Sequence, residues 1–219
     1  MTSTEFIIQN KWNGSVDVYL TLGVGTGFIS DIKKIPFIKH VTNPHQGYFT
    51  LEAGKSVKYT SPKDEVFSGN VCFNSPPLNC PDKGFPLSTN LGEFTLNIHH
   101  LNPDGLETID ISNVAGANSY MEFLLSKGGK WNAGAKYPDV KSFKNKKLGE
   151  NVGSVGVYPF GCDDCTASVA PPKCSSKPEG APNPPVPQKE AICNVQRPSS
   201  NAGGSVTLRY LGPIPYTLD

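Results

Sequence analysis

Apolar and polar residues alternate with a period of two along much of the chain, a pattern that predicts β-strands. In residues 15–22, the apolar Val16, Val18 and Leu20 occupy every second position, as in a strand with one buried face. Residues 48–60 alternate on both sides of a Glu-Ala-Gly-Lys sequence at 52–55, which indicates a hairpin turn. No stretch combines a helical period with caps at both ends, so the sequence predicts an all-β sandwich or barrel. Further strands are expected at residues 4–9, 66–73, 92–98, 107–112, 119–125 and 205–211.

The composition supports this class and excludes several others. The chain has 219 residues, of which 22 are Gly and 20 are Pro, and only 18% are charged, unlike a coiled coil or a helical bundle. Its 11 Phe, 8 Tyr and 2 Trp supply enough apolar surface for a core, which excludes a disordered chain. The net charge of +1 is unlike that of a nucleic-acid-binding protein. No apolar run approaches the roughly 20 residues that cross a bilayer, so we expect neither a nucleic-acid partner nor a membrane span.

The composition changes after residue 126, and this change divides the chain. Seven lysines fall within residues 127–150, and seven prolines fall within residues 171–187. Both segments are expected to be loop-like or extended. We predict a β-sandwich core formed by residues 1–126 and 200–219. Residues 127–199 are expected to form a loop-rich, disulfide-containing appendage.

Two carboxylates are expected to meet on the polar face of one hairpin. Glu93 alternates with apolar residues in 92–98, and Asp110 lies between two isoleucines, so both acids are expected to face away from the core. An Asn-Pro-Asp-Gly turn at 102–105 predicts that the two strands pair. Two carboxylates in a groove could hydrolyse a glycosidic bond or accept hydrogen bonds from sugar hydroxyls. The structural alternative is that they only keep the sheet face soluble.

The even number of cysteines predicts disulfides and an oxidising compartment. The six candidates are Cys72, Cys80, Cys162, Cys165, Cys174 and Cys193. The first two flank a tight loop and are expected to form a local bridge. The other four can be joined in three ways. Of these we favour Cys162 with Cys174 and Cys165 with Cys193.

No metal site and no cofactor are predicted. Cys162 and Cys165 have the spacing of a zinc knuckle, but the other two nearby cysteines lack it. The adjacent His99 and His100 would point to opposite faces of a strand and could not bind one metal ion together. The glycine-rich residues 21–27 lack the helix and the lysine of a phosphate-binding loop.

The hairpin with the two carboxylates also resembles a known family. Residues 91–97 read Leu-Gly-Glu-Phe-Thr-Leu-Asn, and residues 109–114 read Ile-Asp-Ile-Ser-Asn-Val. These sequences resemble the core strand pair of the thaumatin-like proteins, the osmotin and pathogenesis-related family. Residues 51–56 and 117–123 resemble further segments of that family in the same order. The resemblance implies a flattened β-sandwich, here with few cysteines and a reduced, loop-rich second region.

The resemblance also implies an acidic cleft built from one arginine and four carboxylates. Glu93 and Asp110 match two of the carboxylates, and Glu107 stands where the family has an aspartate. Asp163 or Asp164 could supply the last one. The position of the arginine falls on Gly69, so the cation is missing. The disulfide that joins the two ends of the fold in the family is also missing: Trp12 or a neighbour occupies one place, and residues 211–213 occupy the other.

These features lead to three hypotheses about function. The first is a protein of defence or host–microbe interaction that binds carbohydrate, a cell-wall β-1,3-glucan, through Glu93, Glu107, Asp110, Asp163 and Asp164. The second is a weak endo-β-1,3-glucanase, with Glu93 and Asp110 as its catalytic pair. The third is an interaction protein that kept the scaffold and lost the site. The first residues lack the pattern of a signal peptide, so either the protein stays inside the cell or this sequence is the mature form of a secreted protein. The even number of cysteines favours the secreted, mature form.

Overall fold

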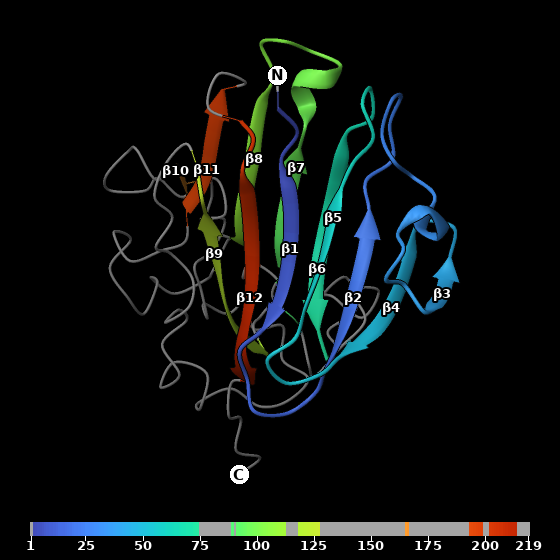
Figure 1. Cartoon of the computed structure of the whole chain (residues 1–219), viewed down its shortest axis with the longest axis vertical. Coiled ribbons are helices and arrows are strands. Elements are labelled where there is room, and N and C mark those ends of the chain that lie inside the picture. Colours follow the sequence, from blue (N-terminus) through green and yellow to red (C-terminus); the bar gives the residue numbers. More distant parts are fainter. Residues whose placement is uncertain are drawn as a thin grey trace, which may run out of the picture.

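Two β-sheets pack face to face in the part of the chain that the structure describes (Figure 1). The structure is a computed structural model that describes residues 2–74, 89, 91–112, 118–127, 165–166, 193–198 and 202–213. The predicted all-β sandwich architecture is confirmed. Two short 3-10 helices, η1 (Ile32–Lys34) and η3 (Ile98–His100), join strands. None of the helices in these residues is long and apolar enough to span a membrane.

The smaller sheet joins the beginning of the described chain to its end. Its order is β5 (Ser56–Thr60), β1 (Glu5–Asn10), β12 (Ser205–Pro213) and β9 (Ser119–Leu125). β1 and β12 pair in parallel, with Glu5 opposite Ser205. β1 is antiparallel to β5 on its other side. The two ends are therefore held together by main-chain hydrogen bonds in the middle of a sheet (Figure 1).

The larger sheet contains the predicted hairpin near its centre. Its order is β10 (Cys165–Thr166), β11 (Cys193–Pro198), β8 (Leu106–Ser112), β7 (Leu91–Leu96), β6 (Phe67–Phe73), β2 (Val16–Leu22), β4 (Gln46–Leu51) and β3 (His40–Asn43). β7 and β8 are antiparallel neighbours. β11, which the predicted division assigns to the appendage, pairs with β8. Most of residues 127–199 lies outside the described residues, and the division itself stays a prediction.

The core lies between the sheets and uses the apolar half of each alternating pattern. In β2 every second residue from Val16 to Leu22 is buried. Phe6 of the smaller sheet stacks on Phe94 of the larger one, with ring centroids 4.3 Å apart. Aromatic contacts of this kind add to the free energy of burying the rings. The alternate side chains of the larger sheet point away from the core and form its outer face.

Two local predictions need correction. The sequence at 52–55 does not close a hairpin, because β4 belongs to the larger sheet and β5 to the smaller one. It is instead a turn that crosses between the sheets, with Gly54 at a φ of 71°. The strand predicted for 92–98 ends early, because Asn97 adopts the left-handed conformation and His99 and His100 enter η3. The centroids of their rings lie 4.6 Å apart, so the two side chains do not lie on opposite faces of a strand.

Trp12 and Gly212 lie in the two segments where the resemblance expects the terminal disulfide. A Cβ atom on Gly212 would lie 2.5 Å from Cε3 of Trp12, so the indole packs directly on the glycine backbone. Gly212 has a φ of 131°, a conformation that other residues rarely adopt. A packed aromatic ring thus stands in place of a covalent link at this end of the sandwich.

Candidate functional site

The register of the larger sheet places polar residues in one row across its outer face. Thr21 of β2 lies opposite Gln46 of β4 on one side and Asn70 of β6 on the other. Asn70 lies opposite Glu93 of β7. Glu93 in turn lies opposite Asp110 of β8. These five residues are called the polar row below, and they cross five neighbouring strands.

An open groove of about 360 Å³ lies over the middle of the polar row. Its side-chain hydroxyls come from Ser68, Thr95 and Thr108 as well as from the row itself. The Oγ of Ser68 and the Oγ1 of Thr95 are hydrogen-bonded at 2.8 Å. The described lining contains one carboxylate, from Glu93, and no lysine or arginine. The groove therefore presents neutral donors and acceptors together with a negative group.

Two amides of the polar row have acceptor oxygens to which no described residue donates. They are Oδ1 of Asn70 and Oε1 of Gln46, both buried. The amide nitrogen of Gln46 donates to Oγ1 of Thr21 at 2.9 Å. Buried acceptors normally receive a hydrogen bond. Asn70 lines the groove, but its oxygen is buried beneath the groove surface and is not itself a contact for a ligand.

Three stacked rings border the polar row on the same face. Tyr19 of β2 stacks on Tyr48 of β4 with ring centroids 5.0 Å apart. Tyr48 stacks on His40 of β3 at 4.6 Å. Burial raises the pKa of Tyr19, and the negative charge of Asp17 raises it further. The Tyr19 hydroxyl therefore stays neutral at physiological pH and can donate a hydrogen bond.

The structure separates the predicted site residues into three groups. Glu93 is half-buried and lines the groove, and the backbone of Asp110 lies directly opposite it. Asp163 and Asp164 lie outside the described residues. Glu107 is only 2% exposed. It lies two positions before Ile109 in β8 and therefore on the same, inner face of the sheet. The prediction that Glu107 binds a ligand in the cleft is therefore wrong.

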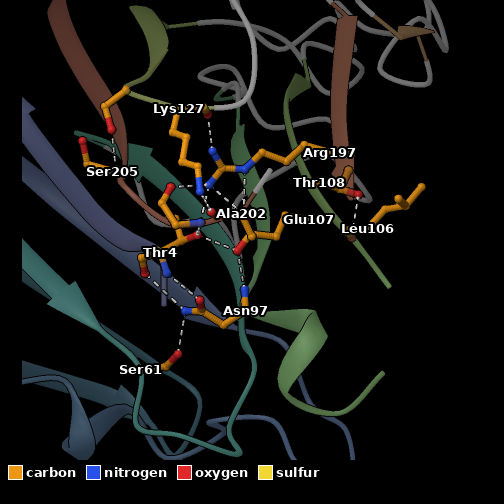
Figure 2. Close-up of polar contacts among 12 residues, drawn as sticks. Thr4, Ser61, Asn97, Leu106, Glu107, Thr108, Lys127, Arg197, Ala202 and Ser205 are labelled. Carbon is orange, nitrogen blue, oxygen red and sulfur yellow. Dashed lines mark hydrogen bonds and ion pairs between the residues drawn. The ribbon is translucent and has the colours of Figure 1, made fainter. Parts of the chain in front are cut away.

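Glu107 instead forms a buried ion pair with Arg197 of β11, a residue that the sequence analysis missed (Figure 2). Oε2 of Glu107 lies 2.7 Å from Nη2 of Arg197, and both side chains are 2% exposed. Nε of the same guanidinium donates to Oε2 at 2.7 Å. Oε1 of Glu107 accepts from Oγ1 of Thr4 and from the backbone N–H of Asn97, each at 2.7 Å. Every oxygen of the buried carboxylate is therefore hydrogen-bonded.

The other contacts of Arg197 connect it to the ends of the fold. Its Nη1 donates to the carbonyl of Lys127, and its Nη2 donates to the carbonyl of Gly203 at 3.2 Å and to Oγ1 of Thr4 at 3.0 Å. The ammonium of Lys127 donates to the carbonyl of Ala202 at 2.9 Å. We call Thr4, Asn97, Glu107 and Arg197 the buried polar cluster. It has a structural role, because none of its polar atoms reaches the groove.

At Gly69, where the resemblance places an arginine, the structure has no space for a side chain. A Cβ atom at this position would lie 2.1 Å from the backbone carbonyl oxygen of Thr21. No real Cβ atom makes so short a contact. β2 and β6 approach each other so closely here that the backbone leaves no space for any side chain.

His99 is buried beside the polar cluster, and neither of its ring nitrogens bonds to a described residue. Burial lowers the pKa of His99, and the neighbouring His100 lowers it further. The folded state therefore favours the neutral ring, whereas the unfolded chain takes up a proton at a pKa of about 6.5. The stability that neutral His99 contributes is fully present above pH 6.5 and is lost as the pH falls.

Acidification below about pH 6.5 is expected to destabilise the folded chain through His99. The free energy of unfolding should fall by up to about 1.4 kcal/mol per pH unit from this residue alone. Urea titrations at a series of pH values measure the slope. His99→Gln should reduce the slope, and His40→Gln, which removes an exposed imidazole, is the control. An unchanged slope in His99→Gln would contradict the assignment.

The described residues leave the cysteine predictions open. Cys72 is buried in β6, and its predicted partner Cys80 lies outside the described residues, as do Cys162 and Cys174. The backbones of Cys165 and Cys193 lie directly opposite each other in the parallel pair of β10 and β11. This register agrees with the pairing that we favour, which stays a prediction. No cluster of potential metal ligands occurs among the described residues.

Comparisons with known proteins give distant similarities only. No protein-family model matches the sequence, and no curated protein matches it. A thaumatin-like xylanase inhibitor is 11% identical, with a TM-score of 0.41, 94% of this chain covered and 99% of that chain covered. The protein elicitor MoHrip2 from Magnaporthe oryzae is 12% identical, with a TM-score of 0.39, 96% of this chain covered and 100% of that chain covered.

Proposed function

We propose that the groove on the outer face of the larger sheet binds a polysaccharide of the β-1,3-glucan type, and that the chain acts by binding this ligand. The observation that carries the proposal is the lining of the groove: hydroxyls, an amide and one carboxylate, without a described lysine or arginine. The choice of a β-1,3-glucan and of a defence or host–microbe setting comes from the family resemblance. A ligand of the cell wall requires a secreted protein.

The chemistry of the lining suits a neutral ligand with many hydroxyls. Each serine or threonine hydroxyl can donate one hydrogen bond and accept others, and the carboxylate of Glu93 accepts only. A sugar ring carries both donors and acceptors, so it can satisfy both kinds of group. Hydrogen bonds to a charged group contribute about 1.5–3 kcal/mol each. An anionic ligand would meet no cation in the described lining.

Glu93→Gln is expected to lower the retention of the protein on insoluble β-1,3-glucan about tenfold. The substitution keeps the shape of the side chain but replaces a charged acceptor by a neutral amide. Asp110→Asn, at the position opposite, should have an effect in the same direction. Glu52→Gln is the matched control, because Glu52 is exposed in the turn between the sheets. Equal retention of Glu93→Gln and the control would remove the groove from the proposal.

A second measurement, on the same variants, distinguishes binding from hydrolysis. Residues directly opposite each other in an antiparallel pair have Cβ atoms about 4.5–5.5 Å apart, and retaining glycosidases hold their two carboxyl groups about 5–5.5 Å apart. Glu93 and Asp110 occupy such a pair of positions. Release of reducing sugar from laminarin by the wild type, but not by Glu93→Gln, would favour a glucanase. If the wild type is not retained on the glucan and releases no reducing sugar, the result would favour an interaction protein that lost the site.

A further inference from the structure

A second cavity, of about 430 Å³, opens at the side of the sandwich, away from the polar row. Its walls come from β4 of the larger sheet, from the edge strand β5 of the smaller sheet, and from the segment that follows η1. The chain crosses between the two sheets at this side, and the edge of the core is therefore accessible here. Its volume lies within the range of about 300–1,000 Å³ that is usual for small-molecule sites.

The inner surface of this cavity is apolar. Phe49 and Leu51 of β4 are 3% and 4% exposed and belong to the core. The ring of Phe37 packs against Phe49 with centroids 5.0 Å apart. Val57 of β5 is half-buried and packs on the same core. A ligand with an apolar body would extend the core by removing these surfaces from water.

Two lysines supply the charge of the cavity. Lys39 and Lys58 both line it, and none of its described lining residues is acidic. Lys58 forms an ion pair with Glu5 at 3.1 Å, but the lysine side chain is 72% exposed, and exposed pairs of this kind are weak. No described carboxylate forms an ion pair with Lys39. Positive charge at the mouth of an apolar cavity is complementary to an anion with an apolar body.

We propose that this cavity binds an amphipathic anion, an alkyl or aryl carboxylate or sulfonate, with its apolar part against Phe37, Phe49 and Val57 and its charge beside Lys39 and Lys58. The site is independent of the proposed glucan groove, because the two linings share no residue.

Titration of the full chain with 1-anilinonaphthalene-8-sulfonate, an aryl sulfonate whose fluorescence rises in apolar surroundings, tests the site. We expect saturation at one probe per chain and displacement by dodecanoate, but not by dodecyltrimethylammonium at equal concentration. Lys39→Glu should weaken binding about tenfold, because it reverses one charge at the mouth. Glu5→Gln, which releases Lys58 from its ion pair, should strengthen binding. Lys33→Glu, an exposed lysine outside the cavity, and Glu93→Gln should leave binding unchanged.

Opposite shifts in Lys39→Glu and Glu5→Gln would support the site even if the glucan experiment failed. Three results would overturn it: no saturable binding, equal competition by the cationic amphiphile, or the same affinity in Lys39→Glu and Lys33→Glu. Circular dichroism of each variant checks that the probe reports a folded chain, because partly unfolded proteins also bind this dye.

Discussion

Removing the charge of Arg197 is expected to lower the free energy of unfolding by about 3–5 kcal/mol, the usual cost of leaving one member of a buried ion pair alone. In Arg197→Met the carboxylate of Glu107 would remain 2% exposed with no cation beside it. Three backbone or hydroxyl acceptors would also lose their donor, since the guanidinium serves Lys127, Gly203 and Thr4. Unfolding in urea, followed by tryptophan fluorescence, measures the loss.

A second ion pair of the same types provides the matched control. Nη1 of Arg209 lies 3.1 Å from Oε1 of Glu122, but these side chains are 31% and 26% exposed. Arg209→Met should therefore cost no more than about 1 kcal/mol. Arg197→Met combined with Glu107→Leu removes both buried charges and should recover part of the loss. Equal costs for Arg197→Met and Arg209→Met would show that the Glu107 pair is not buried in solution.

Substitutions in the buried polar cluster are expected to cost much stability because the cluster connects several distant segments of the chain. Oγ1 of Thr4 donates to Glu107 and accepts from Nη2 of Arg197 and from the N–H of Gly203, so it uses its whole hydrogen-bonding capacity. This single hydroxyl joins the start of β1, the strand β8, the strand β11 and the segment before β12. The resemblance expects a disulfide between the ends of the fold. Here the parallel pair of β1 and β12 and this cluster hold the ends together.

The sequence predicted the sheet architecture because alternation reports which residues of a strand are buried. The same pattern does not report which strand is the neighbour. The turn at 52–55 therefore looked like a hairpin although β4 and β5 belong to different sheets. The early end of β7 was also hidden, because only the left-handed conformation of Asn97 and its four-way hydrogen bonding reveal it.

In the candidate site, too, the sequence predicted what depends on neighbouring residues and missed what depends on residues far apart in the chain. Alternation placed Glu93 on the outer face. Applied in the same way, it would have placed Glu107 inward with Ile109, two positions along, but the family resemblance suggested the cleft. Arg197 left no local signal, because its partner Glu107 is 90 positions away in the chain. The polar row follows from strand order and register, which the sequence alone did not supply.

Gly69→Ala is expected to lower the free energy of unfolding by about 2–3 kcal/mol, within the upper range for overpacking a closely packed site. The new methyl group would meet the carbonyl oxygen of Thr21 at 2.1 Å, and this oxygen belongs to the backbone, which cannot rotate away as a side chain can. Relief of the clash requires β2 and β6 to move apart and therefore weakens their hydrogen bonds. Since Gly69 lines the groove, retention on β-1,3-glucan should fall with stability.

The appropriate control is Gly14→Ala, because a Cβ atom at Gly14 would lie no closer than 3.4 Å to its neighbours and should change stability by less than about 0.5 kcal/mol. Gly69→Arg, which restores the arginine implied by the resemblance, should be at least as destabilising as Gly69→Ala and should not restore a family-type cleft. Wild-type stability of Gly69→Ala would show that β2 and β6 can separate at no cost. In that case the missing arginine would need an explanation other than the close approach of these two strands.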